Sequence, residues 1–137
     1  MSRFGRVGGA ALLLAVAATA NAEDRKADFE ARKTEAMRNF KSDAGKEYAE
    51  SFGKAFGAEV SPTLNSCAQE TGAAMGENFD LLLKIGAKGA VEEALVKPET
   101  KLAECFRRKA KARTYPAPPS AGYWVVNGIN FTQVPAP

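Results

Sequence analysis

The clearest pattern in this chain is a change of period in its second half. Residues 79–85 alternate apolar and polar positions, with Leu82 as the exception, which predicts a strand with one buried face. Residues 86–89 begin and end with glycine and predict a tight connection. Residues 90–97 predict a second strand, and their blurred alternation indicates a bulge. Residues 98–112 then place apolar side chains at helical spacing, so a hairpin followed by a helix is expected.

The N-terminal half has helical patterns only. Residues 23–41 are highly charged, and their large apolar residues are Phe29, Met37 and Phe40, so a solvated helix is expected, with partner binding as the alternative. A second helix is predicted by aromatic residues at four-residue spacing, Tyr48, Phe52 and Phe56. Gly57 is expected to end it. Ser61 and Pro62 then predict the start of a further helix with Cys67 on its apolar face.

The C-terminal part predicts one more strand. Residues 115–119 are rich in proline and cannot continue the preceding helix. Residues 123–131 are aromatic and β-branched, which is typical of a strand, and residues 135–137 are expected to form a frayed tail. Because this strand comes last, one of its edges is expected to lack a neighbour and to be open to a partner strand. The alternative is that the N-terminal helix covers this edge, so that no peptide could dock. The candidate partner-binding residues are Tyr123, Trp124, Val125, Val126, Ile129 and Phe131.

The first 22 residues have the pattern of a secretory signal. Arg3 and Arg6 precede a short apolar run, and an A-x-A cleavage pattern ends at Ala22. The run is shorter than a membrane-spanning helix, so a retained anchor is the weaker interpretation. We expect a periplasmic or secreted chain that begins at Glu23 and is not stably inserted in a membrane. Loss of Arg3 and Arg6 leaves 17 of the 19 basic residues against 16 acidic ones, a net charge of +1, which gives no reason to expect nucleic-acid binding.

Two cysteines, Cys67 and Cys105, are present. An even count in an exported chain favours a disulfide, because that compartment is oxidising. Both cysteines lie on the apolar faces of their predicted helices, which would bring the sulfur atoms together if both helices pack on the same side of the sheet. The alternative is two separate buried thiols that behave as small apolar side chains.

Catalytic chemistry has few candidates in this sequence. There is no histidine, no C-x-x-C pair and no glycine-rich phosphate loop after a strand, so we expect no cofactor, no metal and no enzymatic activity. The acidic groups near the hairpin are the remaining acid–base candidates, and solvent-facing carboxylates there are ordinary. They are Glu77, Asp80, Glu92 and Glu93.

Residues 58–131 resemble the TonB C-terminal-like domain, and they look closest to the C-terminal domains of AgmX and PglI-type envelope proteins. The resemblance rests on Cys67, the strand–turn–strand pattern of residues 81–91, the helix around Cys105, the Tyr-Pro-Ala-Pro-Pro run at 115–119 and the final strand. It implies an α+β fold, in which a three-stranded antiparallel sheet packs on two helices. One or two extra helices would precede that domain.

The expected organisation is therefore a signal at 1–22, a charged helical region at 23–57 and a TonB C-terminal-like domain at 58–134. The resemblance implies a protein-contact module, so we expect an exported, non-enzymatic binding or scaffold domain that contacts another envelope protein, by strand addition. The alternative is a periplasmic carrier with a small-ligand pocket between sheet and helices. The expected chain lacks TonB's membrane helix and long Pro-rich spacer, so energy transduction is not carried over.

Overall fold

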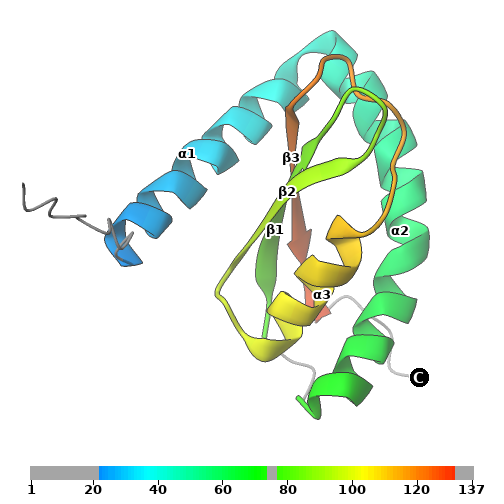
Figure 1. The fold of residues 1–137 in the computed structure, drawn as a ribbon. Helices are drawn as coiled ribbons and strands as arrows, with labels where there is room; N and C mark the ends of the chain where they lie inside the picture. Colours follow the sequence, from blue (N-terminus) through cyan, green and yellow to red (C-terminus); the bar gives the residue numbers. More distant parts are fainter. Residues whose placement is uncertain (1–21, 74–76, 132–137) are drawn as a thin grey trace, which may run out of the picture.

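The computed structural model describes residues 22–73 and 77–131. Over these ranges the chain is an α+β fold, and the predicted signal segment lies outside them apart from Ala22. Two helices diverge from a shared corner, with the strands between them (Figure 1). The elements in chain order are α1 (Ala22–Lys41), α2 (Asp43–Thr71), β1 (Phe79–Ile85), β2 (Val91–Lys97), α3 (Lys101–Lys111) and β3 (Tyr123–Ile129).

The three strands form one antiparallel sheet in the order β2-β1-β3. The predicted hairpin is confirmed, and a register shift between Lys84 and Ile85 confirms the predicted bulge. Gly89 closes the connection with φ of 93°, and a side chain there would clash with the backbone of Tyr115. β1 is therefore the central strand, and β2 and β3 are the two edges.

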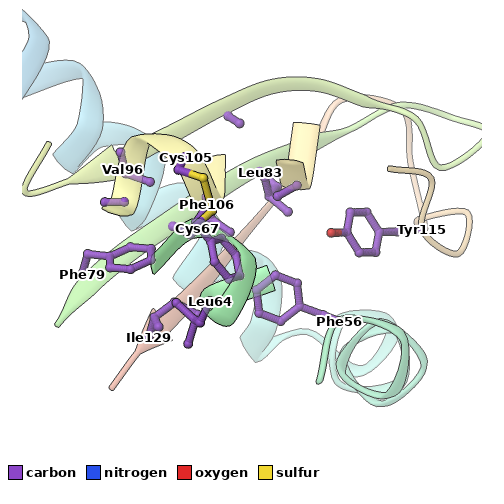
Figure 2. Packing of buried hydrophobic residues seen from close by; sticks show 14 of the residues in the cluster. Phe56, Leu64, Cys67, Phe79, Leu83, Val96, Cys105, Phe106, Tyr115 and Ile129 are labelled. Carbon is purple, nitrogen blue, oxygen red and sulfur yellow. A yellow bond between two sulfur atoms is a disulfide. The ribbon is translucent and has the colours of Figure 1, made fainter. Parts of the chain in front are cut away.

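The main core lies between the sheet and the helices α2 and α3, which cover the same face, as predicted. β1 contributes alternate side chains, Leu81, Leu83 and Ile85, which have no exposed surface. Phe106 of α3 packs edge-on against Phe56 of α2 and Phe79 of β1 (Figure 2). These aromatic contacts join α2, α3 and β1 and hold the two helices to the sheet.

The predicted disulfide is confirmed. The sulfur atoms of Cys67 on α2 and Cys105 on α3 are bonded, and the two Cα atoms are 5.7 Å apart. Both residues are fully buried inside the main core, as Figure 2 shows. The bond ties α2 to α3 across a sequence separation of 38 residues.

The helix ends expected at Gly57 and Ser61 are wrong, because α2 continues without interruption to Thr71 and contains Pro62. A glycine in a helix interior costs about 1 kcal/mol relative to alanine and a proline about 3 kcal/mol. The buried side chains of α2 nevertheless keep one phase on both sides of these residues and all join the main core. They include Tyr48, Phe52, Phe56, Leu64 and Cys67. Burial of this continuous stripe outweighs the local preferences.

A second, smaller core on the opposite face of the sheet corrects two expectations. Leu82 points into it and is fully buried beside Trp124, so the irregular alternation of β1 reflects a strand covered on both faces. α1 supplies the cover through Phe29, which is 5% exposed, and Ala36, which is 2% exposed. The expected solvated helix is therefore a packed one.

Two element boundaries also differ from expectation. α3 begins after Thr100, whose side chain accepts a hydrogen bond from the backbone N–H of Ala103, whereas Pro98 lies outside the helix. β3 ends at Ile129, and Phe131 follows the strand, where its N–H donates to the side chain of Asn78. Within residues 22–73 and 77–131, no helix has the length and apolar character to cross a membrane.

Candidate binding groove at the edge of the sheet

The pairing pattern shows which backbone groups of β3 face away from the sheet. Gly86 donates its N–H to the carbonyl of Ala90, so Gly86 faces the β2 side. Backbone groups alternate in direction along a strand, so Lys84 also faces β2. Its partner on β3 is Trp124, which must therefore direct its N–H and C=O outward. The side chain of Asn39 on α1 confirms this, because its Nδ2 donates to the carbonyl oxygen of Trp124 at 3.1 Å.

The same alternation directs the backbone groups of Val126 and Gly128 outward. In the described ranges β3 pairs with no strand other than β1. Asn39 occupies one outward carbonyl, that of Trp124, at the end of β3 nearest the corner between α1 and α2. The remaining edge presents the ladder donors and acceptors of Val126 and Gly128, which is the arrangement that an added strand needs.

Two hollows follow this edge. The first has a volume of about 310 Å³ and lies between α1, α2 and β3. The second has a volume of about 720 Å³ and lies between α2 and the far half of β3. They share Gly53, Val126 and Asn127, so they form one continuous depression, called the β3 groove from here on. No Asp, Glu, Lys or Arg lines either hollow, although 26% of the chain is charged.

The wall of the β3 groove on the α1 side is apolar and exposed. Met37 is 45% exposed and Phe40 is 53% exposed, and both line the first hollow. Among the described residues these are the large hydrophobic side chains that the fold leaves in solvent. These two apolar side chains lie near the unpaired edge of β3, in the same hollow as Val126.

The wall on the α2 side contains the large apolar side chains of Tyr48, Phe52, Phe56 and Val60, and two exposed glycines among them. Gly53 and Gly57 are one helical turn apart, and an added Cβ at either position would meet no atom within 4 Å. Neither glycine has a positive φ. Neither crowding nor backbone conformation therefore requires glycine here, and its effect is to keep the space above the β3 edge open.

The floor of the β3 groove contains one polar group without a partner. The side-chain nitrogen of Asn127 is buried and makes no hydrogen bond to the described residues. Asn127 pairs with Leu81, so its side chain is on the face of the sheet that α2 covers. A buried amide that donates to nothing is costly, and an acceptor supplied by a bound molecule would remove that cost.

The other edge of the sheet, at β2, has a different character. The hollow beside it has a volume of about 610 Å³ and is lined by charged side chains of both signs, including Arg25, Glu99 and Arg107. Lys97 at this edge pairs with Glu30 of α1 at 2.7 Å, and the pair lowers the pKa of the Glu30 carboxyl. Charges and a bulge on an edge strand protect it against added strands. β3 contains no charged residue, and its register against β1 is unbroken.

The predicted partner-binding residues lie as follows. Tyr123, Val125 and Ile129 face the main core, Trp124 and Val126 face the second core, and Phe131 packs beside the main core. Val126 and Ile129 also line the groove, together with Tyr123, Trp124 and Val125. Sequence reasoning missed Gly53 and Gly57 as a wall. It noted Met37 and Phe40 as large apolar residues in a highly charged segment, and that contrast was the sequence signal that could have placed them in the groove.

Two of the four candidate acid–base residues, Asp80 and Glu92, pair with lysine side chains. Asp80 accepts a hydrogen bond from Lys33 of α1 at 2.9 Å, and this bond raises the pKa of the Lys33 ammonium. Glu92 lies 3.9 Å from Lys84. Both carboxylates therefore form ion pairs with lysine side chains at the surface.

Two basic residues of α3 also form ion pairs. Arg107 binds Glu104 at 2.8 Å, and Lys109 binds Glu70 at 3.2 Å. Glu70 also lies beside Cys67 and Cys105, in the one group of potential metal ligands found in the described part of the chain. Because the disulfide uses both sulfur atoms, that group offers no thiolate to a metal ion.

The chain matches no protein-family model, and neither the curated proteins nor the solved structures contain a significant match to it. The resemblance to the TonB C-terminal-like domain therefore stays a prediction. The site must be interpreted from its own geometry.

Proposed function

We propose that this protein is an exported, non-enzymatic binding or scaffold domain of the cell envelope, and that it binds a partner protein by strand addition at β3. One observation carries this proposal, which is the outward ladder of Val126 and Gly128 at the base of an uncharged groove. Strand addition takes affinity from main-chain hydrogen bonds and specificity from pockets beside the edge. The β3 groove supplies both.

A ligand carrier is the second candidate, because the first hollow reaches about 310 Å³ and its lining is mostly apolar. However, the space between the sheet and the helices α2 and α3 is filled by fully buried side chains, such as Leu83 and Phe106. The hollow lies instead along the strand edge. This position favours a polypeptide over a small molecule enclosed by the fold.

The test uses a proline that removes one outward donor. Val125 is unsuitable, because its N–H faces β1 and proline there would break the sheet itself. Gly128 is exposed and faces outward, and an added Cβ would be 3.6 Å from the nearest atom, the Oδ1 of Asp80. Gly128→Pro is therefore expected to fold. Gly128→Ala is the matched control, because it adds a carbon and keeps the N–H.

The exported protein and both variants are used to capture partners from envelope extract, after circular dichroism shows that each is folded. We expect Gly128→Ala to retain the captured protein and Gly128→Pro to lose it. Equal capture by the two variants would rule out strand addition at β3. Native mass spectrometry addresses the carrier, since a bound small molecule that survives in Gly128→Pro would favour that alternative.

A further inference from the structure

We infer that the β3 groove accepts a single extended and uncharged segment of a partner chain, with large apolar side chains facing α1 and uncharged polar ones facing α2. This inference rests on the proposed function and specifies its ligand. It excludes the edge of a second folded sheet, including that of a second copy of this chain. The electrostatics, the two walls and the floor of the groove each contribute to it.

No charged side chain of the described residues lines the two hollows, which favours an uncharged occupant, and the charges nearest Gly128, those of Lys33 and Asp80, are paired with each other. A Lys or Glu side chain directed into either hollow would lose water and find no opposite charge among the lining residues. Burial of an unpaired charge is strongly unfavourable. The charged hollow at β2 shows that the surface of this protein elsewhere provides such partners, including Lys97 and Glu104.

The two walls impose different side chains on alternate positions. Successive residues of an added strand point to opposite faces of the sheet. Those on the α1 face meet Met37 and Phe40, whose exposed apolar surface would be buried by large apolar side chains. Those on the other face lie beside Gly53 and Gly57, where the missing Cβ atoms leave space. The α1 side therefore favours large apolar side chains, and the α2 side has room for a side chain beside the two glycines.

Asn127 adds a polar requirement on the face of α2. Its buried side-chain nitrogen is a donor, so a Ser, Thr, Asn or Gln of the segment would supply the acceptor that the described residues lack. An apolar residue at the same place would leave the amide unpaired. The pattern that fits is large apolar residues alternating with uncharged polar ones.

The walls also favour an isolated strand over a folded sheet. α1 covers one face of the sheet, and α2 flanks the other at the β3 edge. An added strand needs about 4.8 Å beside β3, whereas a second folded domain brings further layers about 10 Å away on either face. Those layers would meet α1 and α2. A free segment or a flexible terminus of the partner avoids this conflict.

The experiment selects displayed random peptides of about 12 residues, long enough to span the strand, on the exported protein. Affinities of the enriched peptides are then measured through the fluorescence of Trp124, the single tryptophan, which lines the groove. We expect enriched peptides to lack charged residues in a central run that alternates large apolar and uncharged polar residues. Gly53→Leu should fill the α2 side and weaken binding more than about tenfold, or 1.4 kcal/mol.

Ala58→Leu is the matched control, because it places the same side chain on an exposed position of α2 that lines neither hollow. It should leave affinity unchanged. Binding that survives Gly53→Leu, or enriched peptides with central charges, would overturn the inference. If Gly128→Pro abolished binding in the same experiment, strand addition at β3 would still stand. No enrichment, or a dimer that Gly128→Pro dissociates, would overturn it as well. Peptide binding that is insensitive to Gly128→Pro would instead contradict the proposed function.

Discussion

At the scale of single residues, the disulfide is expected to contribute most to stability. Cross-linking Cys67 to Cys105 closes a loop of 38 residues in the unfolded chain. Chain-entropy reasoning for that length gives a stabilisation of about 4 kcal/mol. We expect the double variant Cys67→Ala/Cys105→Ala to lose up to that amount in urea unfolding, and reductant to destabilise the wild type similarly. A loss below about 0.5 kcal/mol, the range of neutral surface changes, would show that the bond contributes little.

Two buried tyrosines predict a loss of stability in alkali. Burial raises the pKa of Tyr48 and of Tyr115 from 10.0 to about 12. Because the folded protein holds these protons more tightly than the unfolded chain, their contribution is complete below the unfolded pKa and is lost as pH rises from about 10 to about 12. Urea unfolding across this window should show a falling free energy of unfolding.

The matched variant for this prediction is Tyr48→Phe. It removes the titrating hydroxyl, together with its hydrogen bond to the Pro116 carbonyl at 2.8 Å. The variant is expected to be less stable at neutral pH and to lose less stability between about pH 10 and about pH 12. An identical pH profile for variant and wild type would mean that Tyr48 does not titrate in this window.

At the scale of elements, α1 combines a structural face and an exposed one. Phe29 is buried against the sheet, with Lys97 5.7 Å above its ring, whereas Met37 is exposed beside the groove. We expect Phe29→Ala to cost about 3 kcal/mol, the lower range for a buried phenylalanine. Hydrogen exchange should then show faster opening of α1.

Met37→Ala is the counterpart, and it should change stability by less than about 0.5 kcal/mol, as exposed substitutions usually do. It should still weaken peptide binding in the β3 groove. If Met37→Ala destabilised the protein as much as Phe29→Ala, Met37 would be part of the fold and the groove would lose its apolar wall.

At the scale of the whole molecule, export is the prediction on which the compartment depends. The confirmed disulfide is compatible with an oxidising compartment. The basic start and the A-x-A pattern before Glu23 predict removal of residues 1–22. Mass spectrometry of the protein expressed with its full sequence should therefore find Glu23 at the N-terminus and no free thiol. A membrane-retained chain that begins at Met1 would contradict this.

Much of the fold follows from local patterns in the sequence. The alternation in residues 79–97, the glycines at 86 and 89 and the apolar positions around Cys105 each specify an element without reference to the rest of the chain. The cysteine pairing also followed, because Cys67 and Cys105 lie on helix faces that share one core. The strand at Tyr123–Ile129 was likewise predicted from its aromatic and β-branched composition.

The tertiary structure decided what local patterns leave open. The cost of Gly57 and Pro62 is local, but the burial that outweighs it exists only when α2 lies on the folded sheet. Whether Leu82 is buried depends on a second layer over its face of the sheet, and α1 provides that layer. The groove itself joins Met37, Gly53 and Gly128 from three elements. No period or spacing relates such residues, because their proximity arises from packing rather than from sequence.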